Sequence, residues 1–139
     1  MAVNNQFSIG VHMMTSLGFA TETGFTSAEL AASVNTSSSF IRRTLAKLSK
    51  AGLIETSKGK NGFCRLRKKP AAISLLDIYL AVEAPKAFSI HHYEEMKPCQ
   101  VSRNIKPALE KALQKVQQAM EASLGDISLA DLLADIRRR

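Results

Sequence analysis

Residues 26–69 read TSAELAASVNTSSSFIRRTLAKLSKAGLIETSKGKNGFCRLRKK, and this stretch decides the fold. Hydroxyl side chains open two short helical patterns, and these residues are favoured at helix starts because their oxygen accepts a hydrogen bond from a first-turn amide. Strand patterns at 53–57 and 62–67 follow, joined by residues 58–61. Glycine and asparagine in such a connection favour a hairpin turn. The stretch therefore predicts helix, turn, helix and then a β-hairpin.

The first of the two helices begins at Thr26. Thr26 and Glu29 fit a capping box, in which the hydroxyl accepts from the Glu29 amide and the Glu29 side chain reaches back to the cap. Leu30 and Val34 lie four residues apart and face the same side. Asn35 ends the helix, because asparagine tolerates the left-handed conformation.

The second helix begins at Thr36 or Ser37, runs to about residue 51 and is followed by Gly52, a C-cap glycine. Its buried stripe is predicted to consist of Ile41, Leu45 and Leu48. The polar residues largely outside this stripe are Ser38, Ser39, Arg42, Arg43, Lys47 and Lys50. A helix that starts with hydroxyls and continues with paired arginines suits insertion of its first turns into the major groove of DNA.

The charge of the chain is concentrated around this stretch. Residues 1–70 hold ten basic and three acidic residues, a net charge of +7, whereas residues 71–139 hold nine of each and are neutral. This asymmetry is typical of a surface that meets phosphates. Two lysines at the hairpin tip, Lys58 and Lys60, are placed to reach a phosphate or a minor groove.

The composition limits the class of protein. With 139 residues, 45% hydrophobic and 22% charged, the chain fits a soluble globular protein with one core or one core plus an extension. No apolar run approaches the ~20 residues needed to cross a bilayer, and the N-terminus lacks the pattern of a signal peptide. Two cysteines are too few for a secreted disulfide scaffold, so we expect a cytoplasmic protein with no membrane partner.

Elements outside this stretch complete the predicted order. Residues 5–17 favour a helix, although Gly10 weakens the pattern, and Gly18 is expected to begin the exit from it. Ser74 caps a helix that stops at residues 84–85, and Ser128 caps a short last helix. Residues 85–104 are expected to form an irregular loop.

A long helix is predicted over residues 105–124, with Pro107 tolerated in its first turn. Such a helix is ~30 Å long, more than a winged domain of about 80 residues covers, which favours pairing of subunits. Packing within its own subunit is the alternative. The dimerisation stripe would comprise Ile105, Leu109, Leu113, Val116 and Met120.

In this order of elements lie the strings LSKAGLIETSKG, ISLLDIYLAVEAP, PCQVSRNI and ISLADLL. The chain resembles the Rrf-two family of bacterial winged-helix transcription regulators, which includes IscR, NsrR and CymR, and within it the YwnA-like branch. The resemblance implies a homodimer that binds palindromic operators and is paired by its long helix. It also implies base contacts at Ser39, Arg42 and Arg43 and a minor-groove contact at Lys58.

The sequence departs from the family in two places. Iron–sulfur members carry three cysteines in the loop before the long helix, and this chain has only Cys99 there, so we expect neither an iron–sulfur cluster nor another cofactor or metal. The family wing commonly ends with two glycines and an aromatic residue, where this chain has Asn61, Gly62 and Phe63.

Cys99 leaves two interpretations open. With His92 seven residues before it, Cys99 is a possible sensor of a redox or thiol signal. The alternative is a lone thiol in a loop. No nucleophile elbow, phosphate loop or paired carboxylates indicate an enzyme.

We therefore predict an α+β, mainly α fold: a winged helix-turn-helix with a long C-terminal dimerisation helix. Residues 1–84 would form the DNA-binding domain, and residues 85–139 the sensor loop and dimerisation helices. The predicted function is a transcription regulator that binds double-stranded DNA in a sequence-specific manner as a homodimeric repressor. The alternative is a winged-helix protein-interaction module without operator binding, in which the basic residues only form a solvated helix face.

Overall fold

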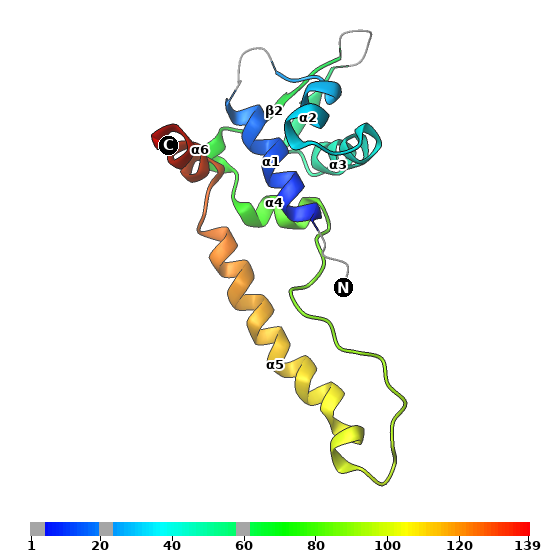
Figure 1. Cartoon of the computed structure of the whole chain (residues 1–139). Helices are drawn as coiled ribbons and strands as arrows, with labels where there is room; N and C mark the ends of the chain where they lie inside the picture. The colour runs from blue at the N-terminus through cyan, green and yellow to red at the C-terminus, as the bar shows by residue number, and fades with distance from the viewer. Residues whose placement is uncertain (1–4, 20–23, 58–61) are drawn as a thin grey trace.

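A computed structural model describes residues 5–19, 24–57 and 62–139. Figure 1 shows a body of helices and a small hairpin, from which one long helix and the loop before it extend. The elements are α1 (Gln6–Phe19), α2 (Ser27–Val34), α3 (Ser38–Lys50), β1 (Ile54–Thr56), β2 (Cys64–Leu66), the 3-10 helix η1 (Pro70–Ala72), α4 (Leu75–Ala81), α5 (Gln100–Gly125) and α6 (Leu129–Arg138). The predicted mainly helical α+β class with a winged helix-turn-helix is confirmed.

The N-terminal caps of α2 and α3 are hydrogen bonds between residues three positions apart in the chain. Thr26 Oγ1 accepts from the Glu29 amide at 3.1 Å, as predicted. The Glu29 carboxylate, however, accepts from the Thr26 hydroxyl at 3.0 Å and not from the backbone amide that a capping box requires. Asn35 ends α2 in the left-handed conformation with φ 61°, and Ser37 caps α3 by accepting from the Phe40 amide at 3.2 Å. The tight turn between the two helices is therefore fixed by local hydrogen bonds.

The wing is a two-stranded antiparallel hairpin in which Ile54 pairs with Leu66 and Thr56 with Cys64. Phe25 also pairs with Cys64, since the two residues exchange backbone hydrogen bonds of 3.0 and 2.7 Å. The segment before α2 thus extends the sheet by one bridge. The hairpin tip, with Lys58 and Lys60, lies outside the described residues.

Two glycines let α1 lie close to its neighbours. A Cβ at Gly10 would lie 2.9 Å from Val82 Cγ1, and one at Gly18 would lie 2.8 Å from Leu133 Cδ1. Gly18 is buried and is the second-to-last residue of α1, which ends at Phe19, close to the predicted exit from the helix. Close packing, and not a break in the helix, explains both glycines.

Serines cap α4 and α6, as predicted, and both form complete capping boxes. The two helix starts are also joined to each other. The Leu75 amide donates to the Ile127 carbonyl and the Leu129 amide to the Ile73 carbonyl, both at 2.8 Å. The chain therefore returns, after α5, to the point where α4 begins.

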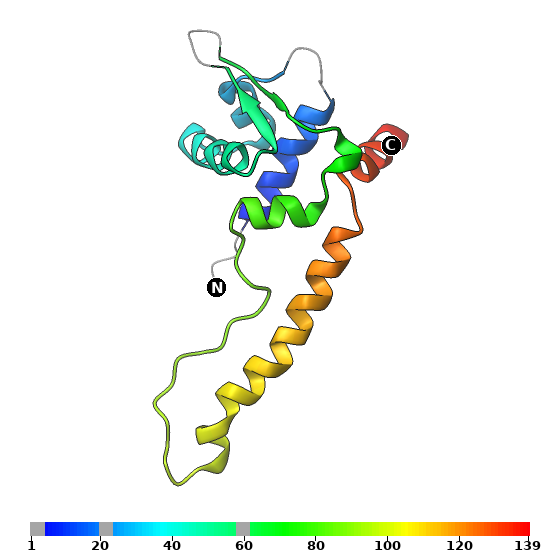
Figure 2. The same ribbon diagram turned by 180° about the vertical axis from the view of Figure 1, so that it is seen from behind.

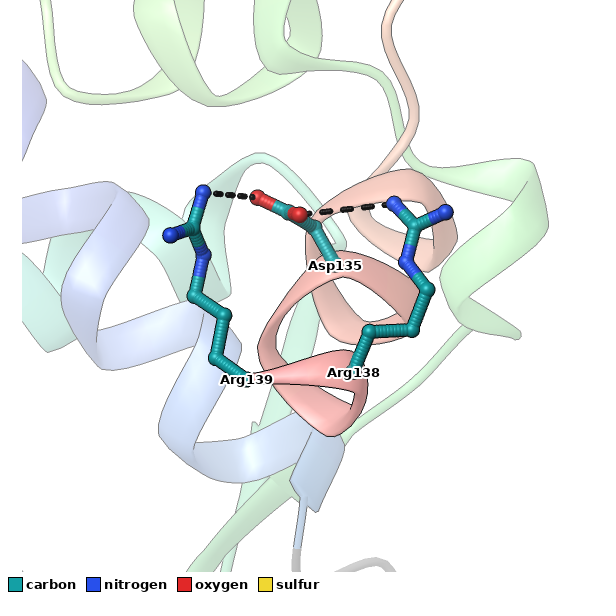
Figure 3. Close-up of polar contacts among 3 residues, drawn as sticks. All are labelled: Asp135, Arg138 and Arg139. Carbon is teal, nitrogen blue, oxygen red and sulfur yellow. Dashed lines mark hydrogen bonds and ion pairs between the residues drawn. The ribbon is translucent and has the colours of Figure 1, made fainter.

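Helix α6 packs against the body through Leu129 and Leu133, which are buried. Near its end, Asp135 lies between two arginines: its carboxylate oxygens are 3.3 Å from Arg138 and 3.3 Å from Arg139 (Figure 3). Exposed ion pairs of this kind stabilise weakly, while cations at a helix C-terminus also interact favourably with its dipole. α6 is thus packed as part of the body. The predicted division into a DNA-binding part, residues 1–84, and a dimerisation part, residues 85–139, stays a prediction.

Helix α5 begins earlier than predicted. Cys99 caps it, because its Sγ accepts from the Ser102 amide at 3.3 Å, and the helix then starts at Gln100 and not at 105. Pro107 is therefore the eighth residue of α5, and its predicted place in the first turn was wrong. Since proline lacks an amide hydrogen, the carbonyl of Arg103 loses its helical donor.

None of the described helices is long and apolar enough to cross a membrane.

Candidate nucleic-acid interface

Helix α3 divides cleanly into a buried and an exposed side. Ile41, Leu45 and Leu48 are buried, as predicted, and Thr44 is buried with them because its hydroxyl donates to the Phe40 carbonyl at 2.9 Å. That self-contained hydrogen bond makes a polar residue acceptable in the core. The exposed residues are Ser38, Ser39, Arg42, Arg43, Ala46 and Lys50. Five of the six predicted contacts on this helix therefore share a solvent-facing surface.

Lys47 is the exception among the six. Its Nζ lies 3.4 Å from the Val82 carbonyl oxygen and 3.4 Å from Glu83 Oε2, and its side chain is 36% exposed. The lysine therefore binds the C-terminal end of α4, where an unpaired carbonyl and a carboxylate attract it. This contact joins residues 35 positions apart, so no local pattern in the sequence could indicate it.

Arg43 is held over an aromatic ring. Its guanidinium carbon lies 5.7 Å from the centroid of Phe40, within the range of cation–π attraction. A guanidinium presents donors in a fixed planar fork that matches guanine O6 and N7. The side chain next to it, Arg42, is exposed as well and projects about 100° further around the helix. The pair therefore offers two forks in different directions.

The stem of the wing contains a contact that sequence reasoning missed. Arg65 lies over the Phe63 ring at 4.7 Å, and its Nε is 3.4 Å from Oε1 of Glu55, its cross-strand partner. Alternation along the strand was the available signal, because residues 63 and 65 fall on one face. The arginine thus makes one contact on its own side of the hairpin and one across to the other strand, close to the hairpin tip.

Further basic side chains continue from the wing toward α4. Arg67, Lys68 and Lys69 are exposed between β2 and η1. Together with the α3 residues they account for much of the net +7 of residues 1–70. A concentration of positive charge on a helix and its neighbouring hairpin attracts a polyanion before any specific contact forms.

A family model described as Rrf2, iron-dependent transcriptional regulator, matches residues 3–135. The chain belongs to the Rrf2 family. It is 32% identical over 131 residues to YwnA of Bacillus subtilis (strain 168), a protein classed by inference as an HTH-type transcriptional regulator, and the match covers 94% of this chain and 96% of YwnA. The resemblance seen in the sequence is thereby confirmed.

Solved structures of Rrf2-like regulators agree with the fold. A protein from Lactobacillus plantarum described as a transcriptional regulator is 26% identical with a TM-score of 0.82, over 96% of this chain and 90% of that one. IscR of T. potens is 23% identical with a TM-score of 0.71 and coverage of 98% and 88%. CymR, the global cysteine regulator of B. subtilis, is 22% identical with a TM-score of 0.68 and coverage of 96% and 97%. These likenesses support the winged-helix fold, and the family is one of DNA-binding transcription regulators and not of enzymes.

The cysteines of this Rrf2 chain do not fit an iron–sulfur cluster. The whole sequence holds two: Cys64 lies in β2, and Cys99 caps α5. Figure 2 shows that α5 begins at the end of the arm that points away from the body. Burial raises the pKa of the Cys64 thiol and thus favours its protonated form. Within residues 5–19, 24–57 and 62–139, no three His, Cys, Asp or Glu side chains gather as a metal site would need. Three thiolates cannot be assembled here.

The two predicted sensor residues have different neighbours. Cys99 is bound to the Ser102 amide, whereas His92 lines a small hollow with Tyr93 and Lys106. Ser102 is itself a centre of contacts, since its carbonyl accepts from the Tyr93 hydroxyl at 2.8 Å and its hydroxyl accepts from the Met96 amide at 2.8 Å. The start of α5 and the loop before it are thus linked through Ser102.

The predicted dimerisation stripe is only partly covered in the single chain: Val116 is exposed, and the other members, Ile105, Leu109, Leu113 and Met120, are half-buried. No residue of α5 is buried, and Val116 is 44% exposed. A groove of about 840 Å³ runs between residues 85–90 and the middle of α5, where Phe88 is 61% exposed. Its lining on α5 includes Leu113, Val116 and Gln117. The long helix therefore presents an apolar face that its own chain covers only in part.

Proposed function

We propose that this Rrf2 protein is a homodimeric repressor that binds a pseudo-palindromic operator, with α3 in the major groove. The observation that carries this is the exposed face of α3, on which two hydroxyls and two arginines occupy the first turns of the second helix of a helix-turn-helix. Side chains at that position contact base edges in this motif. Lys50 would contact a phosphate, and the wing lysines Lys58 and Lys60 would contact a phosphate or the minor groove, with Lys58 the residue expected in the minor groove.

The open face of α5 supports the dimer. A helix of 26 residues is ~39 Å long, and none of its residues is buried in the single chain. A second copy of α5 packed against the stripe of Ile105, Leu109, Leu113, Val116 and Met120 would remove these side chains from water. In this proposal residues 1–84 bind DNA, and residues 85–139, which include the stripe, form the dimer and receive the signal. A regulator of this kind would act in the bacterial cytoplasm.

Arg43→Ala is expected to weaken binding to a specific duplex by about 10- to 100-fold, since one bidentate arginine–guanine pair discriminates by ~1–3 kcal/mol. Binding to a random duplex should fall much less. The specific duplex is the sequence that the wild-type protein selects from a randomised pool. Fluorescence anisotropy with both duplexes measures the two affinities.

Lys50→Ala is the matched control on the same exposed face. It should weaken both duplexes alike and reduce the slope of log affinity against log salt by ~0.9, the value for one phosphate contact. Equal losses on the two duplexes for Arg43→Ala would remove Arg43 from the reading of bases.

Cys99 is the residue through which we propose that a thiol or redox signal enters. Its sulfur caps α5, so a change at the sulfur acts directly on the first turn of the helix that pairs the subunits. Oxidation to the sulfenic acid adds an oxygen at that cap. A displaced first turn would change how the two recognition helices are oriented, and with that the affinity for the operator.

Peroxide is expected to lower the affinity of the wild type for the selected duplex several-fold and to leave Cys99→Ser unchanged. Cys64→Ser is the control and should respond as the wild type does, because burial and a raised pKa keep the Cys64 thiol protonated and unreactive. Titrations before and after treatment measure this. An equal response of Cys99→Ser would show that Cys99 is not the sensor.

A further inference from the structure

The phenol of Tyr79, on α4, joins three segments of the chain. Its hydroxyl donates to the Pro85 carbonyl at 2.6 Å and accepts from Gln117 Nε2 at 2.8 Å. On the other side of the same amide, Gln117 Oε1 accepts from the Ala87 amide at 3.0 Å. Helix α4, the loop after it and the middle of α5 are thereby held together by three hydrogen bonds.

The chemistry of these groups permits only one arrangement. The Ala87 amide can only donate, so it requires the oxygen of Gln117, and the nitrogen of Gln117 then faces Tyr79. The single proton of the phenol goes to the Pro85 carbonyl, which leaves a lone pair for Gln117. The Tyr79 ring is buried and packs edge-on against Phe7 with centroids 5.8 Å apart. Two hydrogen bonds therefore fix the hydroxyl, and the packing of the ring fixes the rest of the side chain.

The same end of α4 also holds the recognition helix. Lys47 of α3 binds the Val82 carbonyl and the Glu83 carboxylate, both at 3.4 Å. Glu83 has φ 56°, the left-handed conformation that turns the chain away from α4 toward Pro85. Residues 79–87 are thus the place where α3 and α5 are tied to one element.

This joint matters because α5 leaves the body. Figure 1 shows α5 extending away from the helices that carry the DNA contacts, with α4 beside its C-terminal half. If two chains pair through α5, the attachment of α5 to α4 determines the separation and rotation of the two recognition helices. One base pair changes the spacing of half-sites by about 3.4 Å and rotates one half-site by about 35° relative to the other.

We infer that Tyr79 and Gln117 are positioning residues that determine which half-site spacing the dimer accepts. The inference rests on the proposed function, because it needs a dimer paired through α5. Neither residue touches DNA. Each acts by holding α5 at a fixed angle to α4, and through Lys47 to α3. Losing the hydrogen bonds leaves the recognition helices intact but lets the two bodies of the dimer take several relative positions.

The test uses the duplex selected by the wild-type protein and versions with one or two base pairs inserted or removed at its centre. The wild type should lose roughly 30-fold in affinity for each shift, as when contacts of one half-site are lost. Tyr79→Phe removes a single oxygen, and Gln117→Leu removes the amide. For both variants we expect less than fivefold variation across the spacings. Sensitivity to a base substitution inside one half-site should stay as in the wild type.

Gln118→Leu is the matched control, since it makes the same change at the next residue of α5, which is exposed. It should keep the wild-type spacing profile. A wild-type profile for both Tyr79→Phe and Gln117→Leu, with melting temperatures close to that of the wild type, would overturn the inference alone. A wild type that is monomeric, or that accepts all spacings equally, would overturn the proposed dimer and the inference together.

Discussion

Leu113→Glu is expected to convert the dimer to monomers and to lower the affinity for the selected duplex by about 100-fold or more. Leu113 lies in the middle of the open stripe of α5 and lines its groove. In a dimer paired there, the carboxylate would be buried without a partner, which costs several kcal/mol, and about 2.7 kcal/mol already corresponds to 100-fold. Analytical ultracentrifugation measures the mass, and anisotropy with the selected duplex measures the affinity.

Ala122→Glu is the control for this change. Residue 122 is nine positions further along the helix, half a turn away from the stripe, and is exposed. The same charge at that point should leave the protein dimeric. A Leu113→Glu protein that is folded and still dimeric would place the interface elsewhere on the chain.

Gly10→Leu is expected to lower the free energy of unfolding by about 3 kcal/mol, the cost of overpacking a core, out of a total of about 5–15 kcal/mol. Even the first carbon of the new side chain would lie 2.9 Å from Val82 Cγ1 and 3.4 Å from Ile78 Cγ2. Both neighbours are buried, and a β-branched valine has few rotamers with which to yield. Urea denaturation followed by circular dichroism measures the loss.

Gly125→Leu provides the comparison, because it makes the same substitution at another helical glycine. A Cβ at Gly125 meets Leu76 Cδ2 at 3.6 Å, an ordinary contact, and the site is exposed. Its unfolding free energy should change by less than about 1 kcal/mol. Comparable losses at both positions would contradict the view that Gly10 is required for the approach of α1 to α4.

Features decided within a few residues could be predicted from the sequence. Four helices are capped by a hydroxyl that accepts from the amide three residues ahead: those of Thr26, Ser37, Ser74 and Ser128. Asn35 adopts the left-handed conformation, which asparagine tolerates better than most residues. The polar face of α3 could be predicted for the same reason, since the period of the helix fixes which residues lie opposite the buried stripe.

Features decided by distant partners could not. Gly18 lies close to the end of α1, as predicted, but nothing near it in the sequence indicates that Leu133 packs against it. Lys47 fitted the pattern of a DNA contact, and nothing near it in the sequence indicates that it also binds Val82 and Glu83, just after α4. The start of α5 was placed too late because cysteine is an unusual cap, and the sulfur of Cys99 supplies the acceptor in place of an oxygen. Tyr79 and Gln117, 38 residues apart, carry no sign of their contact.

The bridge between the starts of α4 and α6 has a consequence for how this architecture can vary. The residues between 82 and 127 leave the body at the end of α4 and come back beside the start of α4. Closing such a loop costs conformational entropy that grows only with the logarithm of its length, about 0.6 kcal/mol for each doubling. The reach of the arm is therefore nearly independent of the stability of the body, and its length can change through insertions or deletions while the DNA-reading surface stays the same.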